Sequence, residues 1–314
     1  MTLIIIISII VLLLLGVSYY LFAMVFDMKI FVPIVDPPEF IDSEKDLMRP
    51  SHFRLIKFMT PYVDRFDELP LEDVYVQSFD GLKLHGLLYK GSEEEVVICA
   101  HGYHSTAKDD YADKIEMYRR RGSTVLMVDM RAHGQSEGRY LGFSEHDKYD
   151  LKSWVEKVNS LYDNPRIYLH GISMGGASVV HTADMHLKNV KGIIDDCGYN
   201  TIDDIVRALI TTNYGVPYFP LAKLAEMWSR LINHVGFKDS IGEEIVKCGE
   251  VPIVFIHGKE DNFVPCWMSE RMYENCTSPK ELLLVDNCGH AAAYACATKE
   301  YEDLVNRLMD GKIR

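Results

Sequence analysis

The stretch Arg166-Ile167-Tyr168-Leu169-His170-Gly171-Ile172-Ser173-Met174-Gly175-Gly176 decides the expected fold. Its first five residues are typical of a strand, and a helix-compatible run begins at Gly176. A serine on such a strand–turn–helix connection is held above the sheet in a strained conformation, and the flanking glycines remove Cβ atoms that would collide there. The pattern predicts a nucleophile elbow at Ser173. An ordinary glycine-rich turn before a helix has the same sequence pattern, so the assignment of a nucleophile elbow depends on the rest of the chain.

Strand-like and helix-like runs alternate on both sides of this turn. Upstream, residues 74–76 and 82–89 flank Asp80-Gly81, a dipeptide suited to a hairpin turn. Strands are then expected at 96–100, 124–128, 166–170, 190–194, 252–256 and 280–285, with helices at 109–121, 145–160, 176–187, 266–274 and 294–309. Short links between them predict an α/β fold, with an eight-stranded, mostly parallel sheet and helices on both faces.

The alternation stops between Tyr199 and Glu250, where helical patterns occur without a convincing strand. We expect a helical lid insertion at 199–250. It holds a set of apolar residues at helical spacing: Phe219, Leu221, Leu224, Met227, Trp228 and Leu231. They suit either an acyl-chain pocket or ordinary core packing.

The N-terminal run Leu3–Phe26 holds no charged residue and reaches roughly 36 Å as a helix at ~1.5 Å per residue. That length crosses a bilayer. No basic side chain precedes the run, so an uncleaved single-pass anchor is favoured over a signal peptide or a buried core helix. Lys29 and Lys45 follow it and favour a cytoplasmic catalytic domain, though only slightly, because acidic residues surround both.

The next segment is rich in proline and charge. Its prolines, Pro33, Pro37, Pro38, Pro50 and Pro61, are expected to interrupt any long helix. The predicted organisation is an anchor at 1–27, a tether at 28–70 and a catalytic domain at 71–314. Within the tether, residues 48–59 mix basic and apolar side chains and suit either the membrane surface or a short helix packed on the domain.

The composition argues against nucleic acid as a partner, and against a zinc site or a disulfide framework. Asp and Glu number 46 against 33 Lys and Arg, a net charge of −13 that would repel nucleic acid over most of the surface. The seven cysteines contain no C-x-x-C pair, which fits neither a zinc site nor a disulfide framework. We expect reduced thiols; a single disulfide among the four cysteines after position 260 is the alternative.

A serine hydroxyl needs a base to take its proton and a third group to orient that base. Asp261 lies in the loop after strand 252–256, and His290 lies in the loop after strand 280–285. Asp195 and Asp196 follow strand 190–194 and are the competing acids. The other histidines near strand ends are expected to be hydrogen-bonded turn residues: His101, His104, His133, His170 and His257.

Four motifs in this order resemble the α/β-hydrolase superfamily, in particular its serine aminopeptidase and monoacylglycerol-lipase-like branch with membrane-anchored bacterial members. They are His101-Gly102-Tyr103, the run from Asp129 to Gly138, the Ser173 turn and the loop from His257 to Pro265. The resemblance covers about residues 72–312 and is weakest in the lid. Within Arg131-Ala132-His133-Gly134, alanine stands where relatives often have glycine, which says little about chemistry.

The resemblance implies Ser173 as nucleophile, His290 as base and Asp261 as orienting carboxylate. It also implies an oxyanion hole made by the backbone N–H groups of Tyr103 and Met174. The expected activity is hydrolysis of acyl esters, either lipid or small carboxylic esters. The same residues suit a peptidase, amidase, thioesterase or acyltransferase, and the alternative of another class is a non-catalytic binding module. No metal or organic cofactor is implied, and no oligomeric state is predicted.

Overall fold

A computed structural model describes residues 2–30, 50–213 and 217–313 of the chain. Eight strands form one sheet in the order β1-β2-β4-β3-β5-β6-β7-β8. The strands are β1 (Leu71–Gln77), β2 (Lys83–Tyr89), β3 (Ser92–Ala100), β4 (Ser123–Val128), β5 (Arg166–Ile172), β6 (Val190–Asp196), β7 (Ile253–Gly258) and β8 (Lys280–Val285). The first two are antiparallel and the other six run parallel, so the predicted eight-stranded, mostly parallel sheet is confirmed.

Two apolar layers cover the sheet because alternate residues of each central strand face opposite sides. In β3, Val96 and Ile98 join one core while Val97 and Cys99 join the other. The first face is covered by α5 (Asp147–Leu161), α6 (Met174–Val180) and α10 (Trp267–Asn275). The second is covered by α3 (Ala107–Tyr111), α4 (Ile115–Arg121), α11 (Ala293–Cys296) and α12 (Thr298–Met309).

Helix boundaries differ from the expectation in three places. The helix expected at 176–187 is α6, which begins at Met174 and ends at Val180. The single helix expected at 109–121 is two helices, α3 and α4, because Asp113 and Lys114 turn inward between them and form a buried ion pair. The closing helix is likewise split into α11 and α12. These changes leave the layers unaltered.

The segment expected as a tether contains a helix, α2 (Pro50–Phe66), which includes Pro61. The expectation that Pro61 breaks the helix is wrong. Pro50 stands at the first helical position, where a missing N–H costs nothing. Phe66 is buried in the second core and Phe58 packs edge-on against Tyr294 of α11, so the described end of α2 lies on the domain. Residues 31–49 of the predicted tether lie outside the described residues.

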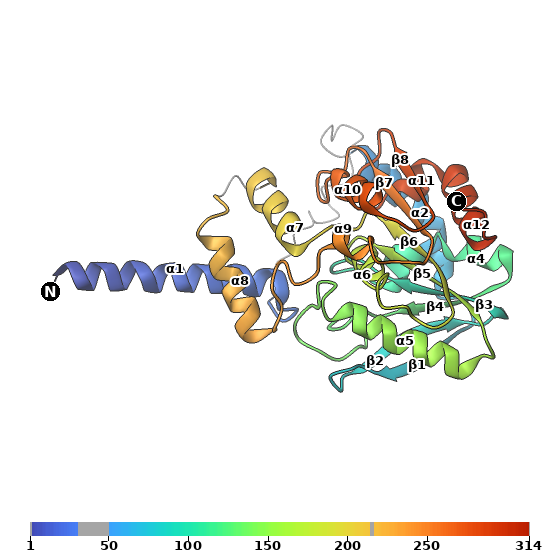
Figure 1. The fold of residues 1–314 in the computed structure, drawn as a ribbon, viewed down its shortest axis with the longest axis horizontal. Coiled ribbons are helices and arrows are strands. Elements are labelled where there is room, and N and C mark those ends of the chain that lie inside the picture. Colours follow the sequence, from blue (N-terminus) through green and yellow to red (C-terminus); the bar gives the residue numbers. More distant parts are fainter. Residues whose placement is uncertain (1, 31–49, 214–216, 314) are drawn as a thin grey trace.

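The insertion consists of α7 (Ile202–Ala208), a π-helical turn at Leu209–Asn213, α8 (Leu221–Ile232) and α9 (Gly242–Ile245). Figure 1 shows α8 crossing the C-terminal part of α1 (Thr2–Phe26), whose N-terminal part projects away from the domain. Trp228 of α8 donates a hydrogen bond from Nε1 to Ser18 Oγ at 3.1 Å. The lid and the apolar N-terminal helix therefore form one packed unit.

Candidate active site

The turn between β5 and α6 holds Ser173 in a backbone conformation that few non-glycine residues adopt, with φ 55° and ψ −115°. A Cβ at Gly171 would collide with the Gly175 carbonyl, and one at Gly175 would collide with the Ala100 carbonyl of β3. The turn is fixed from beneath by the Ser173 N–H, which donates to the Asp196 carbonyl at 2.8 Å. The two glycines thus let the turn press onto the sheet with the serine at its tip.

Ser173, His290 and Asp261 form one hydrogen-bonded chain. His290 Nε2 lies 2.9 Å from Ser173 Oγ, and His290 Nδ1 lies 2.7 Å from Asp261 Oδ2. They come from the ends of β5, β7 and β8, which meet at the carboxyl edge of the sheet. The structure therefore brings together the three residues expected from sequence order, in the arrangement that activates a serine hydroxyl.

Asp261 is surrounded by donors. Its Oδ1 accepts the backbone N–H groups of Phe263 and Val264, both at 2.8 Å. Its Oδ2 lies 3.2 Å from His257 Nε2 in addition to the bond with His290. Burial alone raises the pKa of this carboxyl, but His290 and His257 outweigh burial and hold the pKa well below its usual range. Asp261 is thus an ionised, fixed acceptor.

The competing acids occupy other positions. Asp195 accepts the Gly198 N–H at 2.8 Å, and burial raises the pKa of its carboxyl to about 7. Asp196 accepts the hydroxyl of Tyr301 at 2.9 Å. Because they are neighbours in β6, their side chains point to opposite faces of the sheet, Asp195 toward α6 and Asp196 toward α12. It is Asp261 whose side chain bonds to His290.

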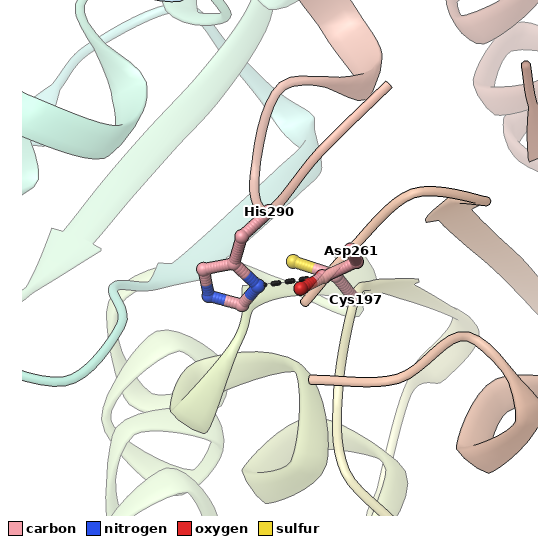
Figure 2. Close-up of side chains that lie close together, drawn as sticks. All are labelled: Cys197, Asp261 and His290. Carbon is pink, nitrogen blue, oxygen red and sulfur yellow. Dashed lines mark hydrogen bonds and ion pairs between the residues drawn. The ribbon is translucent and has the colours of Figure 1, made fainter. Parts of the chain in front are cut away.

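Cys197 lies beside the dyad, and its sulfur is within 4.8 Å of the ligand atoms of Asp261 and His290 (Figure 2). Such a triplet could in principle hold a metal ion. A thiol binds metal as thiolate, yet burial raises the pKa of Cys197 well above its usual value. Asp261 and His290 already bond to one another. The donor set suits a proton-transfer dyad beside a neutral thiol better than a metal centre.

The loop after β3 runs over Ser173. A Cβ at Gly102 would lie 3.2 Å from the Ser173 Cβ, so the backbone here approaches the serine as closely as packing permits. The Gly102 N–H donates to Asp110 Oδ2 at 2.7 Å, which fixes the loop against α3. Tyr103 follows directly. Across the serine, Met174 begins α6, and an N–H in the first turn of a helix has no carbonyl partner within that helix.

Comparison with known proteins agrees with this fold. Residues 91–214 match the family described as serine aminopeptidase, S33. The structure superposes on the Pyrococcus furiosus esterase Pf2001 with a TM-score of 0.66 at 22% identity, over 80% of this chain and 94% of that one. The chain therefore has the α/β-hydrolase fold. The matched S33 region contains the Ser173 turn and the loop after β3.

Sequence relatives match over smaller parts of the chain. The chain is 29% identical to YqkD of Bacillus subtilis over 191 residues, which are 60% of this chain and 63% of that protein. The match therefore spans less than two thirds of YqkD. This chain is also 29% identical to the thiohydrolase aneE of Aspergillus aculeatus over 137 residues, which are 42% of each protein.

The remaining histidines brace the loops around the site. His101 accepts the Met130 N–H at Nε2 and donates from Nδ1 to the Gly102 carbonyl, at 3.0 and 2.8 Å. His133 accepts the His104 N–H at 3.2 Å, and burial lowers its pKa to about 3. His170 is sandwiched between the hydroxyls of Tyr118 and Tyr301. These bonds agree with the expected structural role.

Two contributors were missed at the sequence level. His257 was expected to be an ordinary turn residue, yet it contacts Asp261; its spacing of four residues from Asp261 is the signal that could have found it. Burial lowers the pKa of His257, but the hydrogen bond and charge of Asp261 outweigh burial and raise it. The second contributor is the end of α1, whose approach to Tyr103 has no signal in the sequence because the residues are 78 positions apart.

All seven cysteines of the chain lie in the described residues and are free thiols. No disulfide joins any two of them in the described residues, and the reduced state stays a prediction.

Proposed function

We propose that this chain is a membrane-anchored serine hydrolase that cleaves acyl esters through an acyl-enzyme intermediate. The observation that carries the proposal is the continuous hydrogen-bonded chain from Ser173 Oγ through His290 to Asp261. Its position at the carboxyl edge of a parallel sheet, under the loop of Gly102 and Tyr103, supports the same reaction.

The proposed reaction begins when Ser173 Oγ attacks the ester carbonyl while His290 Nε2 takes the hydroxyl proton. The carbonyl oxygen becomes an oxyanion and is stabilised by the N–H groups of Tyr103 and Met174. Each preorganised donor of this kind is worth about 3–4 kcal/mol in the transition state. His290 then passes its proton to the departing alkoxide oxygen. Water, deprotonated by the same histidine, releases the acid and restores Ser173.

Asp261 keeps His290 in the tautomer with hydrogen on Nδ1, so that Nε2 can accept the serine proton. It also stabilises the imidazolium that forms during attack. The depressed pKa of Asp261 supports this role, because the carboxylate stays ionised throughout.

The anchor is supported by α1, a 25-residue helix of mean hydropathy 2.8. The same helix could serve as a signal sequence by length and composition alone. Its last turns favour retention in the mature protein, since Phe22, Ala23 and Phe26 are almost fully buried in the domain. Cleavage would expose the apolar surface that covers them. The side of the membrane that carries the domain is proposed as cytoplasmic on the two lysines alone.

The test is labelling of the full-length protein in detergent with a fluorophosphonate probe. We expect wild type to react and Ser173→Ala to remain unlabelled. A series of p-nitrophenyl esters of increasing chain length, run beside aminoacyl anilides, then distinguishes an esterase from a peptidase. A wild-type protein that neither reacts with the probe nor turns over any ester would refute the proposal and favour a binding module.

Thioester hydrolysis is the second candidate, because aneE is named a thiohydrolase and the relevant chemistry needs the same residues. Acyl-thiocholine turnover faster than that of the matching ester would favour it.

A further inference from the structure

The C-terminal end of α1 contacts the loop that covers the proposed nucleophile. The hydroxyl of Tyr103 donates to the Val25 carbonyl at 3.1 Å and lies 3.4 Å from the Met24 carbonyl. Tyr103 is also the residue whose backbone N–H is proposed to stabilise the oxyanion. Its side chain therefore ties one oxyanion donor to the N-terminal helix.

The domain supplies the C-terminal cap of α1. The last four carbonyls of a helix lack partners within it and are usually satisfied by water or by capping groups. Here the Phe26 carbonyl accepts the Leu141 N–H at 2.9 Å, and the Tyr103 hydroxyl contacts the carbonyls of Val25 and Met24. Three of these carbonyls are thus bound by residues more than seventy positions away.

An ion pair locks this arrangement just beyond the helix. Asp27 is buried, with 3% of its surface exposed, and accepts hydrogen bonds from Nε and Nη2 of Arg139 at 3.0 and 2.6 Å. The backbone pairs as well, since the Met28 N–H donates to the Arg139 carbonyl at 3.1 Å. Both guanidinium donors converge on one oxygen, Asp27 Oδ2, and charge-assisted hydrogen bonds of this kind are stronger than neutral ones.

Aromatic packing gives a second link between the helix and the loop. Phe143 lies 4.6 Å from Phe26 and 5.8 Å from Tyr103, measured between ring centroids. Phe26 also stacks on Phe237 of the insertion. Movement of the helix end would therefore displace the Tyr103 ring as well as its hydroxyl.

We propose that the last two turns of α1, residues 18–26, are a positioning element of the active site, which holds Tyr103 and its backbone N–H in place over Ser173. The anchor is then part of the catalytic apparatus rather than a detachable tether. The kinetic consequence rests on the proposed function, whereas the restraint on the loop does not.

The test uses full-length protein in detergent micelles and two variants that loosen the contact from opposite sides. Tyr103→Phe removes one hydroxyl and keeps the ring and the backbone N–H. Arg139→Gln removes the clamp on Asp27. The matched controls are Tyr149→Phe, on an exposed position of α5, and Arg119→Gln, a surface arginine on α4.

For Tyr103→Phe we expect kcat on p-nitrophenyl butyrate to fall roughly fivefold, the scale of one net hydrogen bond, with KM within about twofold. A trifluoromethyl ketone, whose adduct carries the oxyanion, should lose affinity by the same factor. Arg139→Gln should lower kcat in the same direction. Because both act through one contact, the double variant should lose less than the product of the single losses. Both controls should match wild type.

Hydrogen–deuterium exchange of residues 101–106 provides a readout that needs no activity. We expect faster exchange in both variants and not in the controls. If wild type hydrolyses esters and both variants keep its kcat and its exchange rates, the positioning role is refuted. A change in KM and melting temperature without a change in kcat or ketone affinity also refutes it, since that marks ordinary stabilisation. If the variants exchange faster but the wild-type protein has no esterase activity, the restraint of α1 on the loop is supported and the proposed function is refuted.

Discussion

At the scale of single residues, one turn contains both Ser173, which we expect to be needed for catalysis, and Gly175, which we expect to be needed for folding. We expect Ser173→Ala to lower kcat by roughly 10⁴–10⁶-fold and to leave the melting temperature unchanged, because alanine fits wherever serine does. Gly175→Ala should instead fail to fold, since its methyl group meets the Ala100 carbonyl. Thermal unfolding followed by circular dichroism, beside ester turnover, measures both. Unfolding of Ser173→Ala would show that the serine is structural.

The two candidate acids are separated by what their side chains touch. Asp261→Asn should cost ~10⁴ in kcat, by analogy with the serine-protease aspartate, because the amide no longer holds the productive tautomer of His290. Asp196→Asn should cost far less, since that carboxyl bonds to Tyr301 and not to His290. Steady-state kinetics of the two variants decides the matter. A larger loss in Asp196→Asn would contradict the assignment of Asp261.

Asp195 gives a pH dependence of stability. Burial raises its folded pKa to about 7, above its unfolded value of 3.8, so its contribution is fully present below about pH 4 and is lost as pH rises through 7. The loss is of the order of 4 kcal/mol at most. Asp195→Asn keeps an oxygen for the Gly198 N–H, so its melting temperature should fall less than that of wild type between pH 5 and pH 8. Equal falls would show that Asp195 is not responsible.

At the scale of elements, sequence reasoning was accurate where burial alone decides the pattern. The strands that became β3 to β8 are apolar on both faces, and the turn at Ser173 needs glycine at fixed positions, so both were readable. The helix end at Asp113 and Lys114 was not, because a buried ion pair looks like two surface charges in sequence. The contact of Tyr103 with Val25 was also unreadable, since nothing local records which distant carbonyl a tyrosine reaches.

The described part of α2 packs on the domain, which places this helix within the folded unit. Phe66 is 4% exposed and joins the core that contains Tyr111 and Tyr118. We expect Phe66→Ala to cost about 3–5 kcal/mol of unfolding free energy. The control is Phe79→Ala, whose side chain is half exposed and should cost far less. Denaturant unfolding of the full chain measures both. If both variants lose the same small amount of unfolding free energy, α2 contributes little to the folded domain and belongs to the tether predicted from its prolines.

At the scale of the whole molecule, the packing of α1 sets how deep the domain would sit in a bilayer. Residues 2–17 include no buried side chain and reach roughly 24 Å as a helix, less than the ~30 Å of the hydrocarbon core. Under the proposed anchoring we expect the following turn, which contacts α8, to lie at the membrane boundary. Tyr19 and Trp228 pack edge-to-face there, 5.4 Å apart, as aromatic side chains do at lipid interfaces.

Under the proposed anchoring we expect the exposed side chains of α8 to lie against lipid, so the proposed enzyme should take esters from the membrane through its lid. Leu231 is 63% exposed on α8. Leu231→Asp should lower hydrolysis of lipid esters held in vesicles roughly tenfold, because a carboxylate resists burial among lipid chains. It should leave hydrolysis of dissolved p-nitrophenyl acetate unchanged, since Leu231 belongs to neither the triad nor the oxyanion loop. Leu161→Asp, at the end of α5, is the matched control and should change neither rate. Equal vesicle rates in Leu231→Asp and wild type would place α8 in water and the substrate outside the bilayer.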